Sequence, residues 1–402
     1  MNLNANSSLL QAAICIKAGV MPLVWGDPGC SKTAATPQLA KSLGFVGITD
    51  DGDFYNRPGF VMTAASYLQP EDVAGLASVG TNGAITRLHD DWIKMAADTP
   101  CLLVIDELNR AVNNATMNTL LRMIQEHMAG GLPLHSGTVM IGTANPVTSD
   151  GAREVNPAAA NRVAHIEWNI DSTDFIDYLL GGKGVMCELP TWELVTEAHH
   201  SEARGLVASF LRANPLKSHI MPKDDTVTDK PWGRAICGPW ASWRSWENLT
   251  KVMAVILSLG DIRKGVYADL LYNLGLGIIG PVAGEFHNFL AKSDLRSGSE
   301  VLDGGTYTVP RRIDILWAEC MSSSIEARHR NTLAAWHACL GVYRAVIKSG
   351  FAEVPVICLP YLVGHLPKGG PGLSPVFTGD LKNQPDIMKL FLSVQDLTKA
   401  YG

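Results

Sequence analysis

The segment GDPGCSKT, residues 26–33, follows the apolar run MPLVW of residues 21–25 and indicates the fold of the first part of the chain. A buried strand, a tight turn with glycine and a following helix aim successive backbone N–H groups at phosphate oxygens. Lys32 and Thr33 supply the ammonium and the hydroxyl that complete such a site. We therefore predict a phosphate-binding loop for a nucleoside triphosphate.

The loop departs from the general pattern at one position. The pattern has glycine immediately before the lysine, whereas this chain has Ser31 there and a glycine two positions earlier, at Gly29. For this segment taken alone, a chance match or a nucleotide binder that has lost its catalysis is the alternative.

Two carboxylates follow a second apolar run. Residues 101–105, CLLVI, lack alternation, as expected for a strand buried on both faces, and Asp106 and Glu107 come next. In a phosphate-loop enzyme, Asp106 would hold Mg²⁺, and Glu107 would polarise the water that attacks the γ-phosphate. The alternative is a helix N-cap, where Asp and Glu are also favoured.

Five apolar runs separated by helical patterns predict a parallel sheet with crossover helices. The predicted strands are residues 21–25, 60–64, 102–105, 139–143 and 163–167. A helix is predicted over residues 115–128. After residue 168 helical patterns dominate, and residues 311–349 carry amphipathic helical spacing after Pro310.

Two more side chains are placed near the site by this sheet. Asn145 follows the fourth strand in GTANP and would lie beside the carboxylates, where its amide could orient the attacking water; a turn residue before Pro146 is the alternative. Arg162 opens the fifth strand, and its guanidinium could reach a neighbouring subunit and neutralise a transferring phosphoryl group. An exposed surface arginine is the alternative.

Composition limits the class of protein. The 402 residues are 47% hydrophobic and 18% charged, enough for a large core and more than one domain. A net charge of −6 without a Lys/Arg run argues against a phosphate backbone as the main partner. Eight cysteines without a CxxC pair predict a reducing compartment, the cytoplasm. We expect no membrane anchor, because no apolar stretch is long enough to span a bilayer.

Taken together, the motifs resemble those of the AAA+ ATPases, and the DELNRA form resembles their MoxR branch. The segments that carry the resemblance are GDPGCSKT, LVIDELNRA at residues 103–111, GTANP at residues 142–146 and NPAAANRV at residues 156–163. LQPEDVAGL at residues 68–76 and ASWRSWENL at residues 241–249 are similar to further parts of that branch. The resemblance covers about residues 1–260, and in that branch small residues other than glycine before the lysine are familiar.

The resemblance implies an α/β fold: a P-loop NTPase three-layer αβα sandwich with a parallel five-stranded sheet, the AAA+ core, at residues 1–170. A helical lid with the second sensor would occupy residues 171–275, and a mainly helical extension residues 276–402. It implies Mg²⁺ bound by Thr33 and Asp106, and catalytic roles for Glu107 and for Asn145 as first sensor. Arg162 would be the arginine finger in trans, and Arg244 the second sensor in cis. Asp106 and the phosphate loop would bind ATP, the loop through Gly26, Asp27, Pro28, Gly29, Cys30, Ser31, Lys32 and Thr33.

The resemblance also implies an ATP-hydrolysing homo-oligomeric ring, usually of about six subunits, that remodels a partner protein in a chaperone-like way. That partner would carry a von Willebrand factor A domain. Two alternatives are a nucleotide-gated assembly scaffold with little hydrolysis, and a nucleic-acid-acting AAA+ motor or defence factor. The preference for ATP over GTP comes from the resemblance, since no base-reading residue is identifiable.

Overall fold

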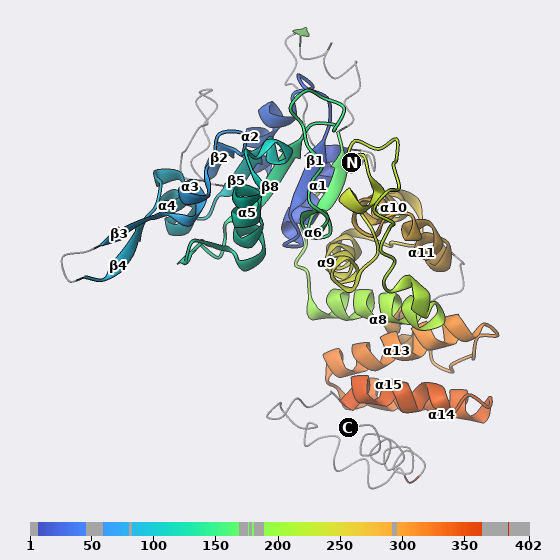
Figure 1. The fold of residues 1–402 in the computed structure, drawn as a ribbon. Coiled ribbons are helices and arrows are strands. Elements are labelled where there is room, and N and C mark those ends of the chain that lie inside the picture. The colour runs from blue at the N-terminus through green and yellow to red at the C-terminus, as the bar shows by residue number, and fades with distance from the viewer. Residues whose placement is uncertain are drawn as a thin grey trace. The chain divides into compact units, whose positions relative to one another are not determined.

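The computed structural model describes residues 7–45, 59–79, 83–168, 189–291 and 296–363, together with the single positions 176, 179, 180 and 385. The chain divides into two compact units. The first unit contains Met1–Trp192 and His219–His287, and the second contains Glu193–Ser218 and Asn288–Gly402. Figure 1 shows their elements.

The first unit is built on a five-stranded sheet in which every pairing is parallel, with the order β2-β5-β8-β1-β9. Its strands are β1 Pro22–Trp25, β2 Phe60–Ala64, β5 Leu102–Asp106, β8 Val139–Ala144 and β9 Ala164–Glu167. Each lies within one residue of its predicted range. The predicted α/β fold with a parallel five-stranded sheet is confirmed.

The sheet is flanked by the helix that precedes β1 and by the helices that connect its strands. They are α1 Ser8–Lys17, α2 Lys32–Ser42, α3 Pro70–Ala74, α4 Asp91–Asp98, η1 Leu108–Arg110, α5 Asn114–Glu126 and α6 Pro157–Ala160. In α5, Met117, Leu120 and Leu121 are buried as their spacing predicts. This helix ends earlier than predicted, because His127 adopts a left-handed conformation with a φ of 56° and Met128 starts a strand.

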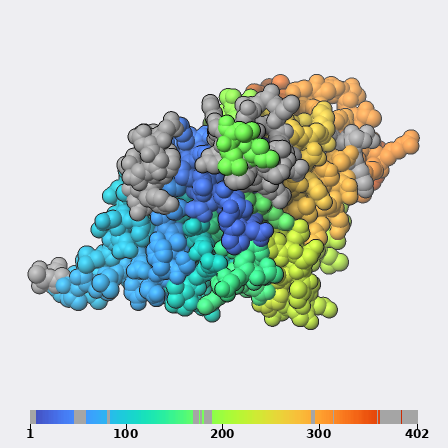
Figure 2. All heavy atoms as spheres, turned by 90° about the horizontal axis from the view of Figure 1, so that it is seen from above, coloured from blue at the N-terminus to red at the C-terminus, as the bar shows by residue number. Residues whose placement is uncertain are grey.

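Two small antiparallel hairpins were not predicted. They pair β3 Leu76–Val79 with β4 Ile85–Leu88, and β6 Met128–Ala129 with β7 Leu132–Pro133. The first projects from the body of the unit (Figure 2), and its aliphatic side chains are largely exposed. Sequence patterning misses such strands, because they are short and bury no regular face.

The first unit also contains the helices expected for a lid. They are η3 Ala235–Cys237, α9 Trp243–Leu259 and α10 Gly265–Ile279, followed by α11 Val282–Ala291, which continues into the second unit. Helix α10 approaches β9 closely: a Cβ atom on Gly277 would lie 2.0 Å from the His165 carbonyl oxygen. Only glycine permits this approach.

The second unit is helical and has its own core, formed by residues such as Leu316, Trp336 and Tyr343. Its elements are α8 Glu197–Ala213, η2 Pro215–Lys217, α12 Gly298–Asp303, α13 Ile313–Arg330, α14 Leu333–Lys348 and α15 Glu353–Val363. The amphipathic pattern predicted over residues 311–349 forms two helices rather than one. The break lies at Asn331, whose φ is 48°, and the Thr332 side chain caps the next helix.

Helix α8 falls inside the range predicted for the lid, but it groups with the second unit. The division into core, lid and extension stays a prediction. Among the described residues, no helix is both long and apolar enough to cross a bilayer.

Candidate functional site

Residues 26–31 form a turn between β1 and α2, and Lys32 and Thr33 begin α2, as predicted. Gly29 has a φ of 79° and Ser31 a φ of 63°, and Ser31 is the N-cap of α2. A left-handed conformation favours glycine, which explains why the general pattern has glycine where this chain has Ser31. Gly26 is needed for space, because its Cβ atom would lie 2.8 Å from Cβ of Trp168.

Lys32 is buried, with 7% exposure, at the centre of this turn. Its ammonium donates to the carbonyl oxygens of Gly26 and Asp27 at 2.6 and 2.8 Å, and to Oδ1 of Asn145 at 3.1 Å. It also lies 3.6 Å from Sγ of Cys30. Phosphate oxygens would be stronger acceptors for the same donor. Pro28 and Gly29 form the tip of the turn.

Thr33 and Asp106 meet across the site. The Thr33 hydroxyl donates to Oδ1 of Asp106 at 2.9 Å, and the Thr143 hydroxyl donates to the same oxygen. Thr143 Oγ1 also accepts the backbone N–H of Glu107 at 3.1 Å. Thr143 therefore fixes both carboxylate-bearing residues at the end of β5.

Asn145 is held from the other side by Asn109. Oδ1 of Asn109 accepts the Asn145 N–H at 3.1 Å, and its Nδ2 donates to the Asn145 carbonyl at 2.7 Å. Asn109 Nδ2 also donates to the Arg153 carbonyl at 3.1 Å. The buried amide of Asn109 thus pins the loop after β8.

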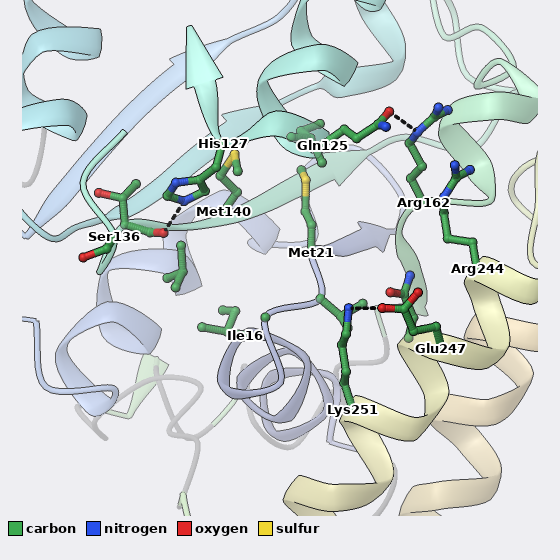
Figure 3. A pocket seen from close by; sticks show the side chains of 16 residues that line it. Ile16, Met21, Gln125, His127, Ser136, Met140, Arg162, Arg244, Glu247 and Lys251 are labelled. Carbon is green, nitrogen blue, oxygen red and sulfur yellow. Dashed lines mark hydrogen bonds and ion pairs between the residues drawn. The ribbon is translucent and has the colours of Figure 1, made fainter. Parts of the chain in front are cut away.

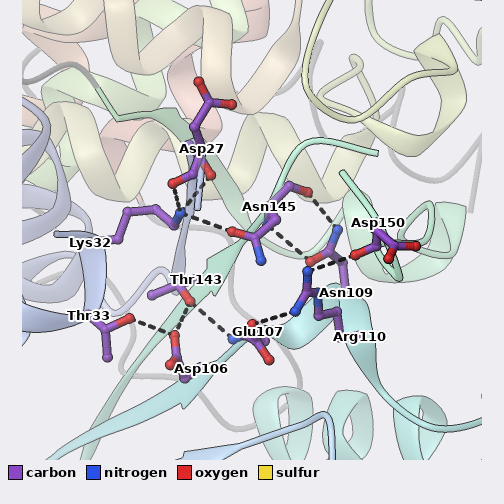
Figure 4. A network of polar contacts seen from close by, with 11 residues as sticks. Asp27, Lys32, Thr33, Asp106, Glu107, Asn109, Arg110, Thr143, Asn145 and Asp150 are labelled. Atoms are coloured by element: carbon purple, nitrogen blue, oxygen red, sulfur yellow. Dashed lines mark hydrogen bonds and ion pairs between the residues drawn. The ribbon is translucent and has the colours of Figure 1, made fainter. Parts of the chain in front are cut away.

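The carboxyl ends of β1, β5 and β8 bring five predicted residues together, as Figure 4 shows. They are Lys32, Thr33, Asp106, Glu107 and Asn145. Ligands of open parallel sheets bind at this edge. A hydroxyl and a carboxylate in contact are suited to Mg²⁺, which prefers oxygen ligands and takes its remaining ones from phosphates and water. No cluster of three or more His, Cys, Asp or Glu side chains that could hold a metal occurs in the described part of the chain.

A buried imidazole on β9, that of His165, supports β1. His165 Nδ1 accepts the Trp25 indole N–H at 3.0 Å, so its Nε2 carries the proton and donates to the Ala160 carbonyl at 2.9 Å. The ring stacks on Trp25 and meets the edge of Trp232. Burial lowers the pKa of His165 to about 4. Directly after β9, the Trp168 indole donates to the Cys30 carbonyl at 2.7 Å and so connects the end of β9 to the phosphate loop.

Arg162 and Arg244 lie elsewhere. They line a pocket of about 420 Å³, here called the arginine pocket, which is also lined by Met21 and Met140 (Figure 3). These two methionines lie at the amino-terminal ends of β1 and β8, opposite the edge that carries Lys32. Strand β1 has four residues and therefore separates the two edges by about 13 Å.

The arginine pocket has an excess of positive charge. Arg162 donates to Oε1 of Gln125 at 2.9 Å and to the Ala158 carbonyl, which are both neutral. Burial and the charge of Arg244 lower the pKa of Arg162. Glu247 is the one acidic residue among the described lining residues, and it pairs with Lys251 at 3.0 Å.

Arg244 does not lie where a second sensor acting in cis is expected. Among the described residues that line the arginine pocket, none belongs to the phosphate loop or to the Asp106–Glu107 pair. The placement of the lid, which local sequence patterns do not encode, brings Arg244 to Arg162 instead. The predicted cis role does not fit this position.

A family model matches the part of the chain that carries this geometry. Residues 22–163 match the family described as AAA domain (dynein-related subfamily). This segment resembles an AAA domain. The matched segment contains the phosphate loop, Asp106, Glu107, Asn145 and Arg162. The chain is also similar to a candidate ATPase from Cytophaga hutchinsonii, with 17% identity and a TM-score of 0.40 over 71% of this chain and 88% of that one. No curated protein matches the sequence.

Sequence reasoning missed three contributors to the site at the carboxyl ends of the strands. Thr143 and Asn109 hold the site by hydrogen bonds, and Trp168 holds the loop. Asn109 and Thr143 lie within the motifs DELNR and GTAN, so the sequence could have indicated that they are close to the site. It could not indicate which groups they bind by hydrogen bonds.

Proposed function

We propose that this chain is an ATPase that assembles head to tail into a closed ring, in which each nucleotide is held between two copies. One copy supplies the phosphate loop, Asp106, Glu107 and Asn145. The next copy supplies Arg162 and Arg244. Both arginines therefore act in trans, which replaces the cis role expected for Arg244.

The observation that carries this proposal is the arginine pair at the edge of the sheet opposite the phosphate loop. Two guanidinium groups side by side repel each other unless an anion lies between them. The pocket's one acidic side chain among the described residues is paired with Lys251. A γ-phosphate bound by a neighbouring copy supplies the missing negative charge, and a repeated head-to-tail contact that closes makes a ring. About six copies is the number that the resemblance favours.

Within one copy, each residue has a defined task. Lys32 binds the β- and γ-phosphates, and the backbone N–H groups of the turn bind phosphate oxygens. Thr33 and Asp106 would hold Mg²⁺, which would neutralise charge on the phosphates. Glu107 polarises the attacking water and Asn145 orients it. Arg162 and Arg244 stabilise the charge that develops on the transferred group.

Hydrolysis then changes the contact between copies. Loss of the γ-phosphate removes the anion that holds the two arginines, so the lid helix α9, which carries Arg244, is released from the neighbour. We propose that this movement remodels a protein partner. The resemblance implies a partner with a von Willebrand factor A domain, and the cysteine pattern favours the cytoplasm as compartment.

A nucleotide-gated scaffold with slow turnover is the second candidate. It is favoured by the ion pair between Glu107 and Arg110 and by the left-handed Ser31. Nucleic acid is a less suitable partner, because the chain has a net charge of −6.

Phosphate release from ATP in the presence of magnesium tests hydrolysis. Wild type is compared with Glu107→Gln, which removes the carboxylate, and with Lys32→Ala, which removes the phosphate ligand. We expect Glu107→Gln to bind ATP and to lose at least about a hundredfold in kcat, and Lys32→Ala to lose binding. Equal rates in the three proteins would contradict hydrolysis at this site.

A further inference from the structure

The candidate site fixes the direction in which a bound nucleotide runs. Asp106 ends β5 and Asn145 follows β8, so a γ-phosphate that these residues act on lies beside these two strands. In the strand order β5-β8-β1-β9, the phosphate loop follows β1, and β9 is the edge strand beyond it. Strand β9 lies three strand spacings, about 14 Å, from β5. The nucleoside end of the ligand therefore extends away from Asp106, toward the carboxyl end of β9.

An indole lies at the carboxyl end of β9. Trp168 directly follows this strand, and its backbone N–H donates to the Trp25 carbonyl at 2.6 Å. Its Cβ atom is so close to the phosphate loop that a Cβ atom on Gly26 would lie 2.8 Å from it. Its indole N–H donates to the Cys30 carbonyl at 2.7 Å. Backbone and ring edge therefore hold the Trp168 side chain beside the loop, on the side where the nucleoside is expected.

The Trp168 ring has a π surface without an aromatic or cationic partner. The residue is half-buried, and among the residues that the structure describes no aromatic ring or cation stacks on it. Trp25 differs, because its ring stacks on His165 and meets Trp232 edge to face. The one polar atom of the Trp168 side chain is already bonded to the loop. The part that remains to bind a ligand is the flat apolar face, which suits an aromatic ring.

From this placement we infer that the Trp168 indole stacks on the base of the bound nucleotide and is a specificity-determining residue. Stacking uses the π face that every base has, and it strengthens with the area of the ring, so it favours purines over pyrimidines. It contacts no hydrogen-bonding edge of the base, so it does not separate adenine from guanine. The inference rests on the proposed ATPase function, because it requires a nucleoside triphosphate on the phosphate loop.

A purely structural role is the competing explanation, since Trp168 also connects β9 to the loop. Two comparisons separate the roles. Trp168→Phe keeps an aromatic ring but loses the N–H donor, whereas Trp168→Leu loses both. Inorganic tripolyphosphate can occupy the loop but has no base. Stacking therefore affects the ratio of the affinities for ATP and tripolyphosphate, whereas support of the loop affects both ligands alike.

The test measures binding by calorimetry with the full chain and magnesium, in the Glu107→Gln protein so that ATP is not consumed. We expect Trp168→Leu to lower the ratio of ATP affinity to tripolyphosphate affinity about tenfold, and Trp168→Phe to keep most of it. ATP and GTP should bind more tightly than CTP and UTP, and Trp168→Leu should reduce this difference. Tyr67→Leu is the matched control, because Tyr67 is an exposed aromatic residue after β2, the other edge strand; its ratio stays unchanged.

An unchanged ratio in Trp168→Leu, with ATP and tripolyphosphate both bound, overturns the stacking alone. If Trp168→Leu does not fold, tryptophan fluorescence decides: ATP but not tripolyphosphate should quench the emission that Trp168→Phe lacks, and equal quenching with and without Trp168 overturns the inference. Equal affinity of the Glu107→Gln protein for ATP, GTP, CTP and UTP overturns it without any variant at Trp168. If that protein binds neither ATP nor tripolyphosphate, the proposed function fails together with the stacking.

Discussion

The buried imidazole of His165 makes the stability of the first unit depend on pH. His165 is 4% exposed, and its two ring nitrogens are occupied by Trp25 and the Ala160 carbonyl. Protonation would place a charge among tryptophan rings and would set the proton on Nδ1 against the Trp25 indole N–H. The folded protein therefore resists protonation, and the pKa of His165 falls to about 4.

The sign and the size of the effect follow from linkage. The unfolded chain binds this proton at a pKa of about 6.5, whereas the folded chain does not until about 4. The stabilisation is present above about pH 6.5 and is lost as the pH falls toward 4. Between about pH 7 and about pH 5, His165 alone lowers the free energy of unfolding by about 2 kcal/mol.

Urea denaturation at these two pH values measures the effect. His165→Gln is the comparison, because its amide can accept from Trp25 and donate to the Ala160 carbonyl without titrating. We expect wild type to lose about 2 kcal/mol more than His165→Gln on acidification. Equal losses in the two proteins would refute the account of His165.

Two backbone predictions concern the same unit. Ser31→Gly relieves the left-handed conformation and should raise the free energy of unfolding by about 1 kcal/mol in urea denaturation; a decrease would show that the serine side chain stabilises the turn. Gly277→Ala places a Cβ atom against the His165 carbonyl oxygen and should lower the free energy of unfolding by about 1–3 kcal/mol. Gly284→Ala is the control, because a Cβ atom at this position in α11 would have no heavy atom within 4 Å; its free energy of unfolding should be unchanged or higher. Equal changes in melting temperature for Gly277→Ala and Gly284→Ala would contradict the close approach of α10 to β9.

The sheet and one half of the site were predictable because their signals are local. Runs such as residues 101–105 are apolar without alternation, and parallel strands place their carboxyl ends at one edge. Lys32 and Asn145 could thus be brought together from positions 113 residues apart. The phosphate loop was also predictable from the sequence. Ser31 has a φ of 63°, a conformation that favours glycine, which is the residue that the general pattern has at this position.

The other half depends on long-range packing. Nothing near Arg244 in the sequence indicates which edge of the sheet α9 approaches, so its position beside Arg162 appears only in the structure. The contact of Arg110 with Glu107 has the spacing of a helical pair, yet it forms across a left-handed residue and a 3₁₀ turn. The break at Asn331 is similar, since one left-handed residue interrupts a pattern that is otherwise continuous.

The central claim is that each site is divided between two copies, and mixing two inactive variants tests it. Lys32→Ala keeps Arg162 but cannot bind nucleotide, and Arg162→Ala binds nucleotide but lacks the finger. Mixed copies contain sites in which an intact phosphate loop faces an intact Arg162. With random assembly, about one quarter of the sites are of this kind.

We therefore predict that an equal mixture of Lys32→Ala and Arg162→Ala hydrolyses ATP at about one quarter of the wild-type rate, although each variant alone is inactive. The same recovery is expected when Arg244→Ala replaces Arg162→Ala. A mixture no more active than its components, or full activity of Arg162→Ala alone, would contradict a site shared between copies.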